Sequence, residues 1–426
     1  MSRPYRVLRH SDFRRVWLAQ LLSLTGSQMQ STAAHWHIYL LTQSPVALGA
    51  LGLVRVLPIV FFSLLGGVLA DRYDRRRLML LTQAFMGVVA GALALRTLAG
   101  HDSVWLLYAT YALLGAASAF DNPARQSLVP RLVPTPDLPA AITLNLTAMQ
   151  AAQIGGPAFA GFLIAHLTGS AGAHPAADSR ALGWIYGANA LSFLGVVLAL
   201  ATIRASGVVA APPSGQHEGL IASAREGLRF VFRTPLLVWT MGLDFVATFF
   251  SGALSLLPIV ADRVLGVGAV GYGWLVAAPA AGALVGSLFT SVRALPRRQG
   301  RVLLWAVGGY GVATIVFGLS RSFPLTFLAL ALTGLADLIS TVIRQTLRQL
   351  LTPDALRGRM TSVTMIFFMG GPQLGEMEAG LVAGIFASQV VGVTVSIVSG
   401  GVLTTLAVIL VAMRSRALRD YEPPAA

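Results

Sequence analysis

The sequence predicts an all-α membrane protein whose twelve transmembrane helices form two pseudo-symmetric six-helix bundles. Three observations predict this fold class: a composition too apolar for a soluble protein, a series of apolar runs long enough to cross a bilayer, and motifs of the first half that return in the second. Hydrophobic residues make up 55% of the 426 residues and charged residues 11%, with a mean hydropathy of +0.71. Because soluble domains carry about a quarter charged residues, most of this chain is expected to lie in lipid.

The predicted helices follow from the apolar runs, because a transmembrane helix needs about 20 predominantly apolar residues. Twelve runs are candidates for spans. They cover residues 16–41, 46–70, 78–98, 104–122, 139–168, 182–203, 235–261, 271–292, 302–320, 323–343, 360–388 and 390–413.

Two repeated motifs relate the halves of the chain. Arg125-Gln126-Ser127-Leu128 returns as Arg344-Gln345-Thr346-Leu347, between the fourth and fifth spans of each half. Gly155-Gly156-Pro157 returns as Gly370-Gly371-Pro372, in the fifth span of each half. A repeat of this length indicates two bundles related by duplication.

The repeat divides the chain into three parts: an N-terminal six-helix bundle (1–203), a central cytoplasmic linker (204–234) and a C-terminal six-helix bundle (235–426). Within the linker, Glu218 to Arg233 has the pattern of an amphipathic helix whose arginines recur at four-residue spacing. Such a helix is expected to lie in the inner membrane interface, with its arginines near anionic head groups. A docking surface for a partner is the less favoured interpretation.

The arginines predict the orientation of the chain in the membrane. If the N-terminus is cytoplasmic, most of the 31 basic residues fall in the termini and the inner turns. The exceptions are Arg55 within a span and Arg96, Arg180, Arg263 and Arg321 near the outer side. Because cytoplasmic loops carry the excess of basic residues, both termini and the linker are expected in the cytoplasm.

Composition and motifs also exclude several classes of protein. The net charge of +14 does not indicate nucleic-acid binding, because the basic residues lie in short clusters between apolar runs. The absence of cysteine excludes disulfides and thiolate metal sites. The sequence has no phosphate-binding G-x-x-x-x-G-K-S/T loop and no constellation of nucleophile and base or of metal ligands. We therefore expect no cofactor, no metal, no nucleic-acid partner and no enzymatic activity.

A short, charge-dense loop joins the second and third spans: Gly67-Val68-Leu69-Ala70-Asp71-Arg72-Tyr73-Asp74-Arg75-Arg76-Arg77. It resembles the G-x-L-a-D-R-x-G-R-R loop between helices 2 and 3 of the major facilitator superfamily. Together with this loop, other stretches resemble the enterobactin-exporter-like branch of that superfamily, which also contains macrolide efflux pumps. These stretches are His35 to Pro45, Ala47-Leu48-Gly49, Glu226 to Val231 and Arg357-Gly358-Arg359.

The chain departs from the family pattern in two places. Asp74 stands where the loop usually has glycine, and the fourth span lacks the arginine that many proton antiporters carry within it. The second departure leaves the coupling ion open.

The resemblance implies a secondary active transporter of the bacterial inner membrane. It would export a small, partly hydrophobic compound, such as a siderophore, a drug or a metabolite, by alternating access and proton antiport. Its expected partners are this substrate, the proton and the membrane lipids, and it is expected to act as a monomer. Two alternatives stay open: an importer that uses the same rocking bundles, and a transporter-like receptor that binds a ligand without moving it.

By analogy with the family, the charged loop is expected to hold the cytoplasmic side closed. The residues of this cytoplasmic gate are Gly67, Asp71, Arg72, Arg75 and Arg76. The carboxylate of Asp71, at a helix end, can accept from nearby arginines or face the positive N-terminus of a helix in the other half. The competing interpretation is a solvated positive-inside loop.

Glycines and prolines of the fifth spans resemble the glycine-proline signature of exporters. The residues concerned are Gly155, Gly156, Pro157, Gly161, Gly371 and Pro372. Small residues let helices approach closely, and proline removes a backbone hydrogen bond. Ordinary packing of membrane helices is the alternative.

Polar residues inside spans are the main candidates for substrate or proton handling, because an ionisable side chain is costly in the bilayer centre unless it faces a cavity or a partner. The candidates are Gln28 and His35 in the first half and Asp244 and Asp337 in the second. His35 is preferred to His37 because it continues a polar stripe with Gln28; the two histidines point about 200° apart. A histidine bonded to a neighbouring helix, and structural pairing of the aspartates, are the competing interpretations.

Arg55, Glu376 and Glu378 are the candidates for a periplasmic gate pair. Arg55 lies roughly 24 Å along a helix from Asp71, and the glutamates lie roughly 26–29 Å from Arg359, at 1.5 Å per residue. These similar depths predict that Arg55 pairs with one of the two glutamates, with Glu376 weakly preferred. A permanent structural pair, or a glutamate satisfied within its own half, is the alternative.

Overall fold

The computed structural model describes residues 4–168, 175–203, 229–292, 297–353 and 357–422. Side chains are described for these residues except 4–6, 64–72, 168, 175–178, 291–292 and 357–369. The described residues divide into two compact units, which are treated separately below.

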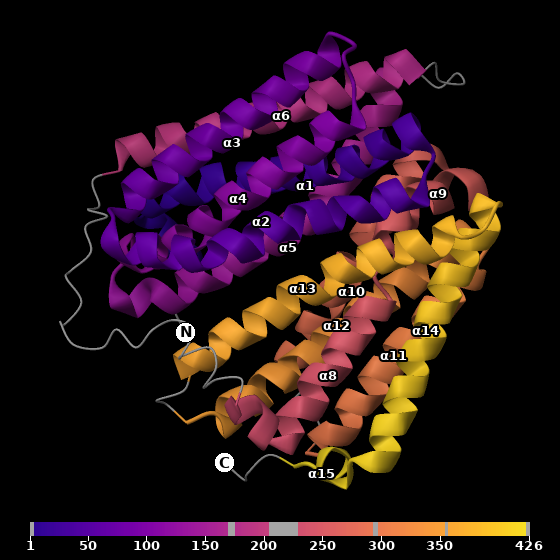
Figure 1. Cartoon of the computed structure of the whole chain (residues 1–426). Helices are drawn as coiled ribbons and strands as arrows, with labels where there is room; N and C mark the ends of the chain where they lie inside the picture. The colour runs from indigo at the N-terminus through magenta and orange to yellow at the C-terminus, as the bar shows by residue number, and fades with distance from the viewer. Residues whose placement is uncertain (1–3, 169–174, 204–228, 293–296, 354–356, 423–426) are drawn as a thin grey trace. The chain divides into compact units, whose positions relative to one another are not determined.

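Unit 1 comprises residues 1–43, 54–213 and 268–277. Its long helices, shown from indigo to magenta in Figure 1, are α1 Ser11–Thr42, α2 Pro45–Arg72, α3 Arg75–Leu98, α4 Val104–Leu128, α5 Leu138–Thr168 and α6 Pro175–Thr202. The first residues of α2, up to residue 53, belong to unit 2. Helix α1 packs against α5 and α6, and α3 packs against α4 and α6. Three short 3-10 helices, η1 Pro4–Arg9, η2 Val129–Arg131 and η3 Thr135–Asp137, flank α1 and join α4 to α5.

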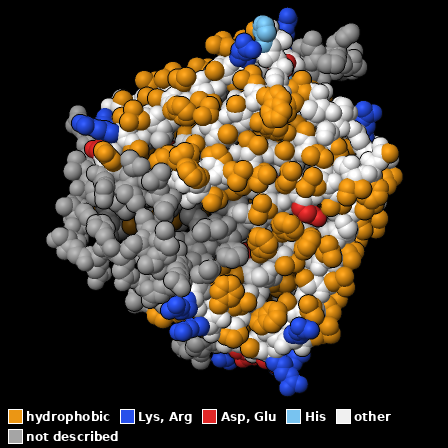
Figure 2. All heavy atoms as spheres, in the orientation of Figure 1, with side chains coloured by type: hydrophobic (Ala, Val, Ile, Leu, Met, Phe, Trp, Pro, Cys, Tyr) orange, Lys and Arg blue, Asp and Glu red, His pale blue; other side chains and the backbone are white. Residues whose placement is uncertain are grey.

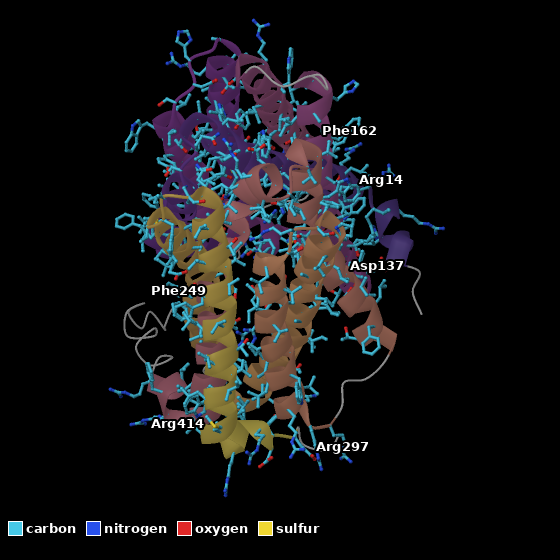
Figure 3. All side chains as sticks on the ribbon, turned by 90° about the vertical axis from the view of Figure 1, so that its right-hand side faces the viewer. Arg14, Asp137, Phe162, Phe249, Arg297 and Arg414 are labelled. Atoms are coloured by element: carbon cyan, nitrogen blue, oxygen red, sulfur yellow. The ribbon has the colours of Figure 1, made fainter. Side chains whose placement is uncertain are left out.

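Unit 2 comprises residues 44–53, 214–267 and 278–426. Its helices are α8 Pro235–Phe250, α9 Leu257–Ile259, α10 Gly268–Val292, α11 Gln299–Leu319, α12 Phe323–Leu351, α13 Arg357–Gly384, α14 Gln389–Arg414 and α15 Arg416–Arg419. The first residues of α10, 268–277, belong to unit 1. Helix α13 packs against α8 and α14, and α11 packs against α12 and α14. Arg297 and Arg414, labelled in Figure 3, lie at the end of this unit where α11 begins and α14 ends.

The packing pairs of the two units correspond one to one. The α1–α5 pair of unit 1 matches α8–α13 of unit 2, and the α3–α6 and α3–α4 pairs match α11–α14 and α11–α12. The predicted fold of two pseudo-symmetric bundles is therefore confirmed.

The seventh predicted span, residues 235–261, is not one continuous helix. Helix α8 ends at Phe250, and short turns from Ala253 to Val264 follow it. The break lies at Gly252, where the backbone of Gly375 in α13 comes so close that a Cβ would collide with it. The regular helix is therefore interrupted at the point where this segment comes into close contact with α13.

The helices present their apolar surface outward, as expected of a chain in lipid. Nine helices of the described part are long and apolar enough to cross a membrane. Large apolar side chains such as Trp105 and Trp305 are about four-fifths exposed. On the described part of the face shown in Figure 2, hydrophobic side chains are spread widely, and charged ones lie mainly near its edges.

An apolar cluster fills the end of unit 1 where α1 begins and α4 ends. Phe13, Val16, Met79, Leu128 and Leu132 are buried there together. Their packing fixes the first turns of α1 against the last turn of α4 and the turn that leads to α5. This cluster forms one wall of a pocket described below.

Candidate functional site

One arginine and two aspartates form an ion-pair cluster in unit 2. Arg344 of α12 pairs through Nη1 with Asp244 of α8, and its Nη2 lies 3.6 Å from Oδ1 of Asp337. Nη2 also donates to the hydroxyl of Thr341 at 2.8 Å. The side chain of Arg344 is 12% exposed, that of Asp244 21% and that of Asp337 51%. A charge that is removed from water needs a partner of opposite charge. Each of the three charged groups has such a partner within the cluster.

The sequence predicted Asp244 and Asp337 but not the arginine that joins them. Arg344 lies beyond the apolar run that ends at residue 343, so the sequence assigns it to an inner turn. In the structure α12 continues to Leu351, and Asp337 and Arg344 lie about two turns apart on one helix face. This spacing is the sequence signal that could have identified the arginine.

A cavity of about 210 Å³ lies beside this cluster in unit 2. Asp337 and Glu376 both line it, together with Tyr310. Four residues with hydroxyl groups also line it: Thr248, Ser251, Thr314 and Thr333. Two acids that the sequence assigned to different sites thus line one cavity.

Unit 1 contains a buried acid that the sequence interpretation missed. Asp121 of α4 is 4% exposed, and its Oδ1 accepts from Thr82 at 3.0 Å and from Gln83 at 2.9 Å. Asp121 lies at the end of the predicted fourth span, where the sequence does not distinguish it from a residue of the following turn. Both donors are neutral side chains of α3, which the carboxylate links to α4.

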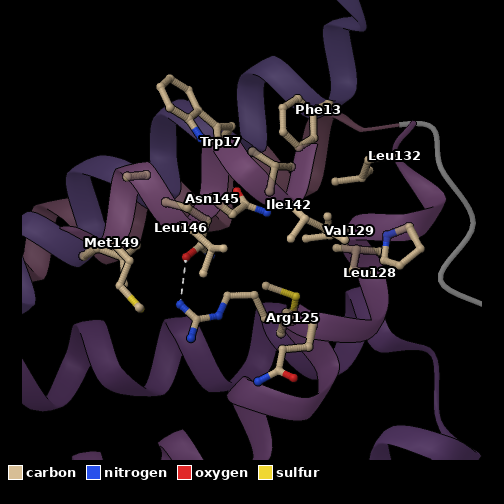
Figure 4. Close-up of a pocket in the computed structure, with 17 residues that line it drawn as sticks. Phe13, Trp17, Arg125, Leu128, Val129, Leu132, Ile142, Asn145, Leu146 and Met149 are labelled. Carbon is tan, nitrogen blue, oxygen red and sulfur yellow. Dashed lines mark hydrogen bonds between the residues drawn. The ribbon is translucent and has the colours of Figure 1, made fainter. Parts of the chain in front are cut away.

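Arg125, the repeat equivalent of Arg344, points into a pocket of about 440 Å³ between α1, α4 and α5 (Figure 4). Its Nη2 donates to Asn122 at 2.7 Å and its Nη1 to Gln20 at 3.4 Å. Both acceptors are uncharged amides. No acidic residue is among the described residues that line the pocket.

Two arginines of the charged loop bind carbonyl groups at helix ends of unit 1. Arg75 donates to the carbonyl of Ser127 at 3.3 Å, and Arg76 donates to those of Leu200 at 2.6 Å and Ala201 at 2.8 Å. Guanidinium groups are favourable at the negative C-terminal ends of helices. These contacts tie α3 to α4 and α6.

Asp74, which departs from the family pattern, is the N-cap of α3: its carboxylate accepts from the backbone N–H of Arg77 at 3.0 Å. This is a common role for aspartate, worth about 1 kcal/mol in helix stability. The surroundings of Gly67 and the side chains of Asp71 and Arg72 lie outside the described part of the chain. The expected contact of Asp71 therefore stays a prediction.

The two histidines of α1 have different surroundings. His35 is partly buried and its Nδ1 lies 2.9 Å from the carbonyl of Ser31, within the same helix. His37 is buried, with Nδ1 3.1 Å from the hydroxyl of Tyr186 and Nε2 3.6 Å from Asp102. His37 thus belongs to the interior of unit 1, whereas His35 bonds only locally among the described residues.

Several of the predicted packing glycines lie at close helix contacts. A Cβ on Gly156 would lie 2.6 Å from Cβ of Gln28 on α1, and one on Gly371 would lie 2.7 Å from the hydroxyl of Thr248 on α8. A Cβ on Gly155 would meet nothing within 4 Å. Pro372 lines the cavity of unit 2.

Two glycine pairs mark the closest crossings. Within unit 1, Gly161 of α5 crosses Gly273 of α10 beside the carbonyl of Pro157, and within unit 2, Gly49 of α2 crosses Gly380 of α13. A Cβ on any of these four glycines would collide with backbone of the facing helix. Small residues therefore allow these helices to approach closely.

The predicted gate pair divides between the units. Arg55 belongs to unit 1 and is exposed there, and its carbonyl contacts Gly115 of α4. Glu376 and Glu378 belong to unit 2 and are partly buried on α13. Glu376 faces the cavity described above.

Two repeated helix bundles with apolar outer surfaces and buried charges define a polytopic membrane transporter of the major facilitator type. Residues 2–423 match the family described as Transmembrane secretion effector, and the chain belongs to this family. It is 27% identical over 416 residues to the enterobactin exporter EntS of Shigella boydii serotype 18 and of Escherichia coli O81. In both cases the match covers 97% of this chain and 95% of the relative.

Solved structures share the fold. A bacterial homolog of the human lysosomal transporter Spinster, in an inward-facing and unoccupied conformation, has a TM-score of 0.74 and 18% identity over 100% of both chains. A point mutant of the nucleoside transporter NupG has a TM-score of 0.72 and 11% identity, covering 95% of this chain and 100% of the other. These similarities concern the fold alone.

The predicted family and fold class are therefore confirmed. The chain is a multi-pass membrane transporter, and at the family level its relatives are transporters and not enzymes.

Proposed function

We propose that this protein exports a small, partly hydrophobic compound across the bacterial inner membrane by alternating access, driven by protons that move inward. Export is supported by the secretion-effector family and by the enterobactin exporters among its relatives. The proposal for the cargo is a siderophore-, drug- or metabolite-like molecule, carried by a monomer whose two termini are cytoplasmic.

The proposal of proton coupling rests on the position of Asp337 between an ion pair and a cavity. This half-exposed carboxylate lies 3.6 Å from Arg344 and also lines the cavity that contains Glu376. Arg344 has a second carboxylate partner in Asp244. Protonation of Asp337 therefore removes one attraction on Arg344 without leaving the arginine unpaired.

This arrangement gives a physical basis for exchange. When Asp337 is ionised, it attracts Arg344, and its charge keeps the cavity hydrated. When Asp337 is protonated, Arg344 is held by Asp244 alone, and the neutral cavity accepts an apolar group at lower cost. Cargo and proton would then occupy the site in opposite phases of the cycle.

Transport of protons against cargo tests the proposal. The full chain is reconstituted in liposomes that contain a pH-sensitive dye, and candidate siderophores, macrolides and dyes are added. We expect cargo-dependent proton movement in the native protein and its loss in Asp337→Asn, while exchange of labelled for unlabelled cargo continues. Asp262→Asn is the matched control, because Asp262 forms a surface pair with Arg263.

The alternatives give different results in the same vesicles. A receptor that does not transport would bind cargo without cargo or proton flux. An importer would move cargo in the same direction as the protons. Proton coupling would be refuted if Asp337→Asn and Asp262→Asn retained equal proton flux.

Within this proposal, Glu376 pairs with Arg55 when the periplasmic side is closed. The pair would form across the two units in one state of the cycle. Arg55→Glu should impair transport, and Arg55→Glu combined with Glu376→Arg, or with Glu378→Arg, should restore part of it. Failure of both double variants, with no cross-link between cysteines at these positions in any state, would exclude the pair.

The cytoplasmic gate is likewise proposed to depend on Asp71, together with Gly67, Arg72, Arg75 and Arg76. Asp71→Asn keeps the shape of the side chain but removes its charge, so transport should fall while the protein still reaches the membrane. Full transport by this variant at normal expression would favour a merely solvated loop.

A further inference from the structure

The pocket between α1, α4 and α5 is separate from the acidic cavity of unit 2. Its volume of about 440 Å³ falls in the usual range for small-molecule sites, roughly 300–1,000 Å³. All the residues that line it belong to unit 1. The proposed proton coupling uses none of them.

The polar groups of this pocket are rich in donors. Arg125 is partly buried, and its two side-chain acceptors, Asn122 and Gln20, are neutral. Gln20 is 8% exposed, and its amide nitrogen has no hydrogen-bond partner in the described part of the chain. The same holds for the indole nitrogen of Trp17. A guanidinium with neutral acceptors beside two unused N–H donors favours an anion, because buried donors and charges need partners.

The remaining wall is apolar. Ile142, Leu146 and Met149 of α5 line it and are each about half exposed, and Leu24 of α1 lies on the same pocket. In Figure 4 the guanidinium of Arg125 points toward this space, with Asn145 and Trp17 across from it. A ligand that fits this lining has an anionic head next to Arg125 and an apolar tail along α5.

We propose that this pocket binds an amphipathic anion, a molecule with one carboxylate or phosphate head and an alkyl or aromatic tail. The head accepts from Arg125, Gln20 and Trp17, and the tail packs on Ile142, Leu146 and Met149. The inference goes beyond the proposed function, because it concerns binding and not proton-driven export. Both a membrane lipid and a transported compound have this chemistry.

Binding is measured by calorimetry on the full chain in nanodiscs of phosphatidylcholine. The probes are dodecanoate, the uncharged dodecanol and the cationic dodecyltrimethylammonium. We expect dodecanoate to bind most tightly and Arg125→Gln to weaken it about tenfold or more, as loss of a charge-assisted hydrogen bond predicts. Arg14→Gln is the matched control, because Arg14 is an exposed arginine on α1 that does not line the pocket.

A second variant leaves every charge in place. Leu146→Trp fills the apolar wall and should also weaken dodecanoate, which keeps the test decisive if Arg125→Gln does not fold. Equal affinity for dodecanoate and dodecanol, or equal effects of Arg125→Gln and Arg14→Gln, would overturn the proposal. So would unchanged dodecanoate binding in Leu146→Trp.

The source of the anion is decided by exchanging the nanodisc lipid. If a lipid head group occupies the pocket, phosphatidylglycerol should compete with dodecanoate and remain bound to the native protein, but not to Arg125→Gln, in native mass spectra. If a transported compound occupies it, phosphatidylglycerol should leave the affinity unchanged, and Arg125→Gln should raise the KM for cargo. Failure of either arm leaves the phenotype of Asp337→Asn untouched, so this inference and proton coupling are tested separately.

Discussion

Arg125 of unit 1 and Arg344 of unit 2 occupy equivalent places in a repeated motif, yet their electrostatic surroundings are opposite. Each donates through Nη2 to a side chain three positions earlier: Arg125 to Asn122 at 2.7 Å and Arg344 to Thr341 at 2.8 Å. The duplication thus preserves the contact within the helix.

The partner from the first helix of each unit makes the difference. On α1 it is the neutral Gln20, and on α8 it is the carboxylate of Asp244, with Asp337 as a second acid. Arg344 is therefore part of a compensated ion cluster, whereas the described acceptors of Arg125 carry no charge. The comparison teaches that one duplicated arginine can serve two purposes, according to what one neighbouring helix supplies.

The largest expected effect is the loss of Arg344. Arg344→Gln leaves Asp244 and Asp337 without their cation in the bundle, and breaking such a buried pair costs about 3–5 kcal/mol. Arg125→Gln leaves no acid without its cation, loses only hydrogen bonds from the guanidinium to neutral amides, and should cost less, about 1.5–3 kcal/mol. Chemical unfolding of the purified protein measures both values. Equal losses would contradict the claimed difference between the two repeats.

The two acids of the cluster are expected to differ from each other. Asp244 pairs directly with Arg344 and is less exposed than Asp337. Asp244→Asn should therefore lower the free energy of unfolding by about 1.5–3 kcal/mol, the usual value for a hydrogen bond to a charged group. Compared with Asp244→Asn, Asp337→Asn should lower the free energy of unfolding less but reduce proton coupling more. Unfolding and vesicle flux, measured on the same preparations, separate the two effects, and the reverse order would reject our division of roles.

Glycines of the repeated Gly-Gly-Pro motif offer a third comparison. A Cβ on Gly156 would meet the carbonyl of Thr25 and the backbone nitrogen of Met29 on α1, whereas the nearest atom to one on Gly371 is the rotatable hydroxyl of Thr248. Overpacking of this kind costs about 1–3 kcal/mol. We expect Gly156→Leu near the upper value and Gly371→Leu near the lower, as measured by chemical unfolding.

The same motif supplies the controls for this comparison. A Cβ on Gly155 or on Gly370 would meet nothing within 4 Å. Gly155→Leu and Gly370→Leu should therefore leave the free energy of unfolding, measured by the same chemical unfolding, almost unchanged. A loss in these controls as large as in Gly156→Leu would show that leucine acts through something other than the helix contact.

Sequence predicted the fold well, because apolar runs, basic clusters and repeats are properties of single segments. The candidate acids Asp244 and Asp337 were also predictable, since an acid in an apolar run is costly wherever its partner lies. The partner itself was not. Arg344 follows the end of its apolar run, and only the packing of α8 against α12 brings Asp244 to it.

The pocket of unit 1 was missed for a related reason. Its charged residue is one of many arginines that the sequence assigns to inner turns, where the positive-inside rule explains them equally well. Trp17, Gln20 and Arg125 come from segments far apart in the chain, and no local pattern states that they meet. Asp121 was overlooked because it ends a span whose boundary the sequence sets only within a few residues.

The smallest expected effect concerns the loops that follow α3 and α11. In unit 1, Asp102 lies after α3, 3.6 Å from His37, and burial raises the pKa of its carboxyl. The polar groups of His37, Ser179 and Thr97 favour the ionised carboxylate and outweigh burial, so the pKa ends below its ordinary value of 3.8. The loop after α11 in unit 2 instead has a hydrogen bond between two uncharged groups. The Thr326 hydroxyl donates to the Ser320 hydroxyl at 2.9 Å.

This difference predicts a pH dependence for one loop alone. A carboxyl whose pKa is lower in the folded state contributes stability above its unfolded pKa, and the contribution is lost as pH falls through the folded value. Asp102→Asn should therefore unfold at a lower temperature than the native protein at pH 7, and this gap should close below pH about 3.8. Thr326→Val, the neutral control, should show a gap that does not change with pH. A constant gap for Asp102→Asn from pH 7 to pH 3, measured by thermal unfolding in detergent, would mean that the carboxylate charge plays no part in holding this loop.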